Sequence, residues 1–219
     1  MIKELKELID KKENLSPFVF EEYHGIRLPL LRKIAKQIAK EKRYDFFLEK
    51  HSCFEERTIH AYAIGYLNEP IEVKLKYMKE FIPTINSWSI NDSLCQNFKS
   101  ARDHQEEVYN FLLTMKDTKN EWESRVISVM LLSHFLNETY IDRVFELLDH
   151  IYKETYFSKM GVAWALATAM GKFPEETFKY LKKNSLDTWT YNKALQKMIE
   201  SYRVSEEDKI KIKQLRKTR

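Results

Sequence analysis

The sequence predicts an all-α fold built from repeated helix pairs. Apolar residues recur at helical spacing almost throughout the chain, and related residue types return every 34 positions. The composition agrees, because the 219 residues include only four Gly and five Pro, too few for the many tight turns of an all-β fold. Helices joined by short polar turns are therefore expected, in one domain over residues 1–219.

The helical spacing of apolar residues is clearest in three segments, 55–67, 123–136 and 159–170. Polar breaks separate the expected helices at 68–70, 116–121, 172–176 and 183–187. Proline suits the first turn of a helix or the position before it, so Pro70 and Pro174 in these breaks mark new helices. No segment alternates convincingly with the period of two that is typical of a half-buried β-strand.

One register of the repeat carries a polar or basic side chain five times in succession, at Arg57, Asn91, Arg125, Lys159 and Lys193. Three positions earlier stand Phe54, Trp88, Trp122, Tyr156 and Thr190, the last with Trp189 beside it. A period in this range with two helices per unit is typical of HEAT-like repeats. The predicted fold is therefore a right-handed α-solenoid of HEAT-like helix pairs with a concave basic face.

The two rows of the repeat have different interpretations. For Phe54, Trp122 and Tyr156 we favour packing, with the aromatic ring filling the same gap between helices in every unit. For the polar row we favour anion binding, because a helix has no packing reason to repeat Arg or Lys in one register. Stacked helices lie about 10 Å apart, so this row would follow several phosphates of a duplex.

The positive charge is concentrated near the two ends of the chain. The net charge of +4 is modest, but the segment 27–43 holds seven basic residues and one acid, and the segment 209–219 holds six basic residues and no acid. These segments are interpreted either as arms around an anionic ligand or as a solvated helix face and a frayed terminus. The candidate phosphate contacts are Arg27, Arg32, Lys33, Arg57, Asn91, Lys159 and Lys193.

The cysteine and histidine content argues against a cofactor. Cys53 and Cys95 form neither a disulfide framework nor a C-x-x-C pair, which predicts a reduced, cytoplasmic protein. The histidines are scattered, and we attribute the nearness of His51 to Cys53 to chance. From these cysteines and histidines we expect no metal and no cofactor. No window approaches the ~18 apolar residues of a membrane span, so we also expect no membrane association.

Four residues on consecutive repeats could carry chemistry. Asp92 follows Trp88 by four positions, which places both on one helical face. Arg125 occupies the next repeat, and Trp164 lies in the one after it, among Gly and Ala. Taken singly, an ion pair between Asp92 and Arg125 and a core position for Trp164 are the simpler interpretations, but the combination favours a functional site.

In these four residues and their surroundings the sequence resembles the AlkD-like DNA alkylation repair family. Members of this family are HEAT-like repeat DNA glycosylases that remove cationic N3- and N7-alkylated purines. The resemblance covers nearly the whole chain and rests on the stretches 25–36, 86–95, 121–132 and 159–166. It implies that Trp88, Asp92, Arg125 and Trp164 form the catalytic group.

The resemblance implies a monofunctional glycosylase that acts on alkylated double-stranded DNA, and a solenoid with capped ends is expected to be a monomer. Asp92 would stabilise the oxocarbenium-like sugar, and Trp88 and Trp164 would face the cationic nucleotide. Arg125 would hold the adjacent phosphate. No Lys is an evident Schiff-base nucleophile, so base removal without strand cleavage is expected.

The chain departs from the family beside Trp88. The family carries a paired Trp-Trp and a second Asp in this segment, whereas Trp88 is flanked here by Ser87 and Ser89, with Ile90 and Asn91 following. This departure indicates a divergent branch. Two alternatives therefore stay open: a non-catalytic solenoid that binds damaged or branched DNA, and a protein-interaction module that holds an acidic peptide.

Overall fold

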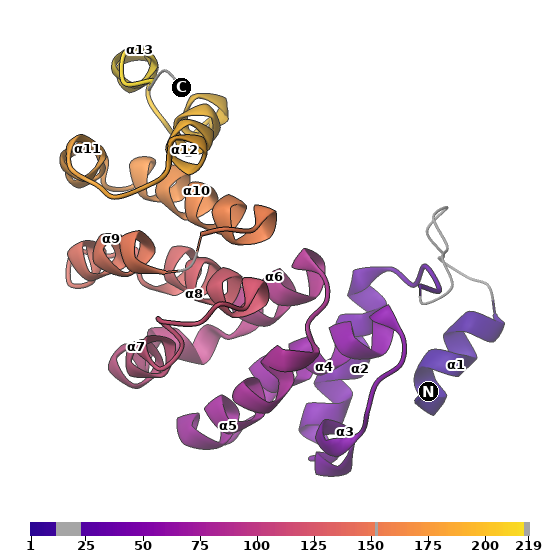
Figure 1. Ribbon diagram of the computed structural model, residues 1–219. Helices are drawn as coiled ribbons and strands as arrows, with labels where there is room; N and C mark the ends of the chain where they lie inside the picture. The colour runs from indigo at the N-terminus through magenta and orange to yellow at the C-terminus, as the bar shows by residue number, and fades with distance from the viewer. Residues whose placement is uncertain (12–22, 152, 217–219) are drawn as a thin grey trace. The chain divides into compact units, whose positions relative to one another are not determined.

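The computed structural model describes residues 1–11, 23–151 and 153–216, and every secondary-structure element among them is a helix (Figure 1). The all-α prediction is therefore confirmed. The chain divides into two compact units, Met1–His104 and Gln105–Arg219. None of the described helices is long and apolar enough to cross a membrane.

The first unit is organised around three neighbouring helices, α2, α4 and α6. Helix α4 packs against α2 and α6, and α5 packs against α4. Helices α3 and α5 contact one another through the rings of Phe47 and Tyr77, whose centroids lie 4.8 Å apart. The elements of this unit are α1 (Lys3–Asp10), α2 (Leu28–Lys40), α3 (Tyr44–Leu48), α4 (Phe54–Tyr66), α5 (Ile71–Phe81), η1 (Ile82–Thr84), α6 (Trp88–Asn97) and η2 (Lys99–Arg102).

Helix α2 shows how the local sequence places the basic residues of this unit. Its apolar residues Leu31, Ile34, Ala35, Ile38 and Ala39 are buried, at the spacing of one helical face. The basic residues between them are exposed. Burial of the apolar stripe against α4 therefore turns the basic run of the sequence toward solvent.

Gly65 permits the close approach of α4 and α6. The side-chain amide of Asn97 donates to the carbonyl of Tyr62 over 2.9 Å. A Cβ atom at Gly65 would lie 2.6 Å from the carbonyl oxygen of Asn97 and closer still to its Nδ2. One of these atoms is backbone, so a side chain here would separate the two helices.

We expect Gly65→Ala to lower the free energy of unfolding by about 1–3 kcal/mol, the usual cost of overpacking, despite the better helix propensity of Ala. Urea denaturation followed by circular dichroism measures this. Gly161→Ala is the matched control, because the nearest atoms there are the Cβ and Oγ of Ser128, at 3.1 and 3.3 Å, and it should cost less. A Gly65→Ala variant as stable as the wild-type chain would contradict the prediction.

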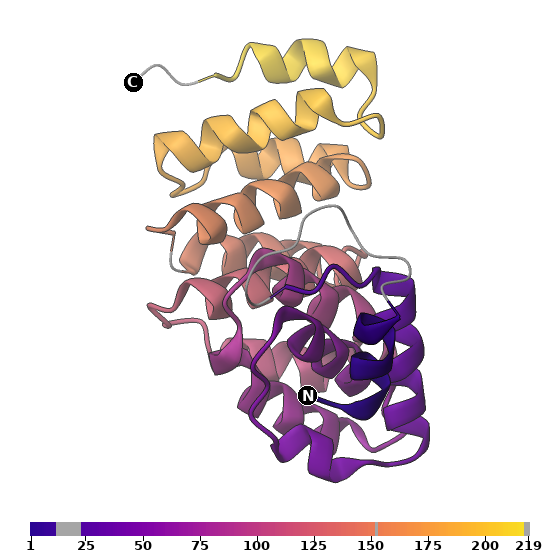
Figure 2. The ribbon, with the colours of Figure 1, turned by 90° about the vertical axis from the view of Figure 1, so that its right-hand side faces the viewer.

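The second unit repeats the same scheme, with α8, α10 and α12 as neighbours. Helix α11 packs against α9 and α10, and α13 packs against α12; Figure 2 shows α10, α12 and α13 one above another. The elements are α7 (Gln105–Leu113), α8 (Glu121–His134), α9 (Ile141–His150), α10 (Tyr156–Met170), α11 (Pro174–Lys182), α12 (Thr188–Glu200) and α13 (Glu206–Lys213).

The repeat in the sequence coincides with a repeat of helix starts. Phe54, Trp88 and Tyr156 are the first residues of α4, α6 and α10, while Trp122 and Trp189 are the second residues of α8 and α12. The predicted polar register accordingly falls between the fourth and the sixth residue of each of these helices. The right-handed solenoid path and its concave face stay predictions.

Candidate nucleic-acid interface

Trp88 and Asp92 occupy one face of α6 in the first unit. The Ser87 hydroxyl caps this helix by accepting the Ile90 N–H over 3.4 Å, which places Trp88 at its first position. The indole is 54% exposed, whereas Asp92, one turn further on, is 7% exposed. An exposed aromatic surface thus stands beside a carboxylate that the fold has largely removed from water.

The basic side chains of α2 lie over tyrosines of α4. The Arg32 guanidinium carbon lies 4.9 Å from the centre of the Tyr62 ring, and the Lys36 ammonium lies 5.3 Å from that of Tyr66. The Tyr62 hydroxyl in turn accepts a hydrogen bond from Ser93 of α6, over 3.2 Å. One row of polar and aromatic contacts therefore joins α2 and α4 to the residue that follows Asp92.

The other predicted phosphate contacts of this unit differ in accessibility. Arg27 and Lys33 are exposed. Arg57 is partly buried, and its guanidinium donates to the carbonyls of His51 and Ser52, over 3.4 and 3.1 Å. Arg57 therefore stabilises the segment that leads into α4, while Arg27 and Lys33 present their charges to solvent.

Asn91 is a correction to the predicted set of phosphate contacts. Its side chain is fully buried in α6, and its Oδ1 accepts from the thiol of Cys95 over 3.7 Å. A group with no exposed surface cannot meet a phosphate, so Asn91 belongs to the core. The sequence pattern could not show this, because periodicity does not tell which neighbour covers a helix face.

In the second unit, Arg125 of α8 is bound to the start of α10. The residue is 6% exposed, and its Nη1 donates to the carbonyl of Phe157 over 3.1 Å. The Phe157 N–H donates to the Glu121 carboxylate over 2.9 Å, and the Phe157 ring stacks on Trp122 with centroids 5.2 Å apart. These contacts fix the guanidinium at the junction of α8 and α10.

The expectation that packing gives no reason to repeat a cation in this register is wrong for the second unit. Arg125 reaches the first turn of α10, and Lys159 of α10 lies 3.5 Å from the carboxylate of Asp187, which caps α12. Each cation satisfies an acceptor at the start of the next helix in the row, so the repeated charge helps to join consecutive helices.

Trp164 lies on α10 and is partly exposed. The small residues around it have a separate cause, since a Cβ at Gly161 would lie 3.1 Å from that of Ser128 on α8. Gly161 and the buried Ala163 and Ala165 therefore serve the close packing of α10 with its neighbours. The role of Trp164, in packing or in the site, stays a prediction.

The indole of Trp189 lies next to two of the predicted phosphate contacts, Lys159 of α10 and Lys193 of α12. The ammonium groups of Lys159 and Lys193 lie 5.8 and 5.7 Å from the indole, and the ring of Tyr156 meets it edge-on at 6.0 Å. Burial raises the pKa of Asp187, but hydrogen bonds from Thr190, the Lys159 ammonium and a bond from Trp189 outweigh it and lower that pKa overall. The start of α12 is thus an aromatic surface flanked by charges.

A groove of about 1340 Å³ extends from this surface along α12 and α13. Trp189 and Lys193 line it together with Lys213 and Arg216, which belong to the basic tail of the sequence. Residues 217–219 of that tail lie outside the described residues. The structure therefore brings part of the predicted C-terminal arm to the same surface as the repeat.

The aromatic residues for which packing was predicted differ in how far they are buried. Phe54 and Trp122 are partly buried, and Phe54 meets Tyr23 edge-on at 5.2 Å. Tyr156, in contrast, is 58% exposed. Sequence reasoning also overlooked Tyr62 and gave little weight to Trp189. The signal for Tyr62 was the run of basic residues at helical spacing in α2. The signal for Trp189 was its position beside Thr190, one residue before the aromatic register of the other repeats.

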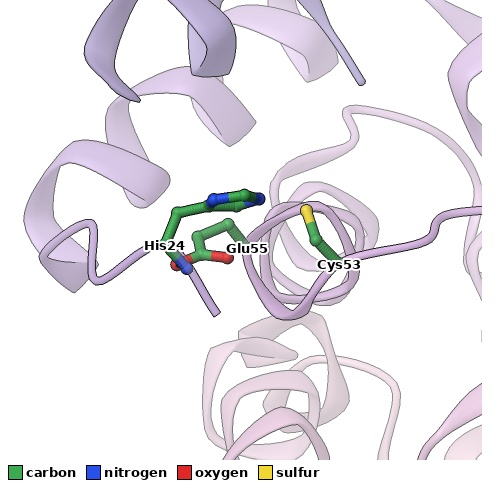
Figure 3. Close-up of side chains that lie close together, drawn as sticks. All are labelled: His24, Cys53 and Glu55. Carbon is green, nitrogen blue, oxygen red and sulfur yellow. The ribbon is translucent and has the colours of Figure 1, made fainter. Parts of the chain in front are cut away.

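The four predicted catalytic residues are shared between the units, Trp88 and Asp92 in the first and Arg125 and Trp164 in the second. Their assembly into one site stays a prediction. The described residues also include one group of potential metal ligands, His24, Cys53 and Glu55 (Figure 3). Its members stand at the start of α4 and in the segment before α2.

These features define an all-helical protein whose aromatic surfaces carry cations suited to a nucleic-acid backbone. Residues 2–198 match the model of a family described as DNA alkylation repair enzyme. The chain belongs to this family, which confirms the resemblance found in the sequence and makes DNA repair its field of function. Comparisons with curated proteins and with solved structures gave no match.

Proposed function

We propose that the chain is a monofunctional DNA glycosylase that hydrolyses the N-glycosidic bond of cationic N3- and N7-alkylated purines in duplex DNA. The observation that carries this proposal is the placement of Trp88 and Asp92, an exposed indole one helical turn from a nearly buried carboxylate. Membership of the DNA alkylation repair family supports alkylated DNA as the substrate.

The chemistry suits these two groups. An alkylated purine that already carries a positive charge leaves as a neutral base when the C1′–N bond breaks, so it needs little help from a general acid. Positive charge then develops on the sugar, and a fixed carboxylate stabilises it most where water is scarce. Asp92 takes this role, and water adds to C1′ and releases its proton.

The indole faces contribute to binding rather than to bond breaking. A cation over an indole is stabilised by about 0.5–2 kcal/mol, depending on desolvation, so the exposed ring of Trp88 favours the cationic nucleotide over an undamaged one. Trp164 is assigned the same role in the second unit. Arg125, whose guanidinium is fixed against Phe157, is assigned to the neighbouring phosphate.

Cations in both units are assigned to the DNA backbone. In the first unit these are the exposed Arg27, Arg32 and Lys33. In the second they are the partly exposed Lys193 and Lys159, the latter also paired with Asp187. The DNA-bound protein is proposed to be a monomer, because nothing in this scheme requires a second copy.

We expect the double variant Arg32→Gln, Lys33→Gln to weaken binding to undamaged and alkylated duplexes alike. Each phosphate contact that is lost should lower the slope of log affinity against log salt by about one. Fluorescence anisotropy over a salt series measures this. Lys76→Gln, Lys79→Gln removes the same charge from exposed positions on α5 and should leave the slope unchanged; equal losses in both variants would contradict the assignment.

The proposed activity is tested by incubating the wild-type chain with a methylated duplex and measuring the released base by chromatography. Free alkylpurine and an intact sugar–phosphate backbone are the expected products. Tight binding with no released base would instead support the non-catalytic DNA-binding alternative. If the chain binds neither damaged nor undamaged duplex, the protein-interaction alternative gains support.

A further inference from the structure

Three potential metal ligands meet at the start of α4, in a cluster separate from the proposed catalytic residues (Figure 3). Cys53 is the N-cap residue of α4 and Glu55 is its second residue. His24 comes from the segment before α2. The imidazole nitrogen, the thiol sulfur and a carboxylate oxygen all lie within 4.8 Å of one another.

Glu55 is fully buried and is held in a fixed orientation. Its Oε1 accepts the backbone N–H groups of His24 and Ile26, over 2.8 and 3.4 Å. Its Oε2 is also buried, and no donor among the described residues reaches it. A buried carboxylate oxygen without a partner is costly, and a bound cation would offset this cost.

Cys53 is likewise buried. Burial raises the pKa of its thiol to about 11, although backbone N–H groups at the start of α4 act in the opposite direction. A divalent ion supplies the positive charge that converts such a thiol to the thiolate, which is the form that binds metals.

We propose that His24, Cys53 and Glu55 form a Zn²⁺ site. A thiolate, an imidazole and a carboxylate are the three ligand types that Zn²⁺ takes in proteins, and three protein ligands leave the fourth tetrahedral position for water. On binding, Cys53 loses its proton to solvent as the Zn–S bond forms. The backbone bonds to Oε1 orient the carboxylate, as outer contacts do for metal ligands.

The site joins two segments that are far apart in the sequence. His24 belongs to the stretch that leads into the basic helix α2, whereas Cys53 and Glu55 begin α4. Bound Zn²⁺ would therefore fix the entry to α2, and with it the backbone that carries Arg27, against the start of α4. This effect on the start of α2 does not depend on the proposed glycosylase activity.

Cobalt is the appropriate probe, because Co²⁺ replaces Zn²⁺ and reports its ligands by absorption. The full chain, freed of metal with a chelator, is titrated with Co²⁺. We expect a near-ultraviolet sulfur-to-cobalt charge-transfer band that disappears on addition of Zn²⁺. Cys53→Ser should abolish the band. Cys95→Ser, which replaces the other buried cysteine, is the matched control and should retain it.

Two further variants test the other ligands. Loss of a residue that only orients a metal ligand weakens metal binding by up to about 100-fold. His24→Ala and Glu55→Gln each remove a ligand itself, so each should weaken Zn²⁺ binding by more than that. The partly buried His24 tolerates truncation, so this variant remains informative if Cys53→Ser fails to fold. Zn²⁺ should also raise the Tm of the wild-type chain and not that of His24→Ala.

A wild-type chain that gives no charge-transfer band overturns the proposal. So does a band that survives Cys53→Ser and is lost in Cys95→Ser, or Zn²⁺ affinity that is unchanged in His24→Ala. Base release from methylated DNA is measured separately and does not enter these outcomes.

Discussion

Asp92→Asn is expected to release alkylpurine from methylated duplex DNA about 10²–10³-fold more slowly than the wild-type chain, while binding the same duplex with similar affinity. The range is the usual effect of removing one preorganised group that stabilises charge in a transition state. The amide has nearly the size and shape of the carboxylate, so the substitution removes charge rather than volume.

The size of the effect follows from where Asp92 lies. Its side chain is 7% exposed, and electrostatic attraction is several times stronger in such surroundings than in bulk water. The ground-state complex depends on the exposed cations and on the indoles, which the substitution leaves intact. The change should therefore appear in the single-turnover rate and not in the dissociation constant.

Asp45→Asn is the matched control, because it removes the same charge from an exposed position on α3 of the same unit. It should leave the rate unchanged. Thermal unfolding of both variants shows whether either has lost its fold. If folded Asp92→Asn releases base as fast as the wild-type chain, Asp92 is not the stabilising carboxylate.

A second large effect is expected from the buried histidine of the first unit. His60 packs among Phe47 and Phe81, with ring centroids 5.2 and 4.4 Å away, and both its ring nitrogens are buried with no hydrogen-bond partner among the described residues. Burial, together with the neighbouring His51, lowers the pKa of His60 from 6.5 to about 3. The folded chain therefore holds this imidazole neutral.

The sign of the pH dependence follows from the two pKa values. Between pH 6.5 and about 3, the unfolded chain binds a proton at His60 that the folded chain does not. The free energy of unfolding should thus fall as the pH is lowered through this window, by about 1.4 kcal/mol per pH unit from this residue. Denaturant unfolding at several pH values measures the slope.

His60→Leu should flatten this slope, because it removes the titrating group from a site of similar volume. Leu112→Ala is the control: it leaves a cavity in the core of the second unit and should lower the stability at every pH without changing the slope. A slope that persists in His60→Leu would assign the acid sensitivity to other residues.

The helical class and the register of the repeat could be predicted from the sequence. Apolar spacing is a property of each helix by itself, and the residues that begin a helix recur in the sequence as they do in the fold. The exposed basic face of α2 could also be predicted from the sequence. Arg32 and Lys33 stand between apolar residues, and burial of those apolar residues turns the two basic side chains toward solvent. Local order alone determined these features.

The accessibility of the polar row was decided by tertiary packing. Asn91, Arg125 and Lys193 share one register, yet the first is in the core, the second is nearly buried and the third is partly exposed. The difference lies in which neighbouring helix covers the start of each, and no periodicity records this. The same packing gave Arg125 and Lys159 their contacts with the next helix in the row.

The sequence by itself determined that this is a helical repeat protein of the DNA alkylation repair family, with Trp88 and Asp92 on one helical face. Only the tertiary structure decided that the Asp92 carboxylate is removed from water while the indole remains exposed. It alone brought His24 to Cys53 and Glu55. The physical reason is that helical spacing fixes neighbours along one helix, whereas burial and contacts between distant segments arise when helices pack.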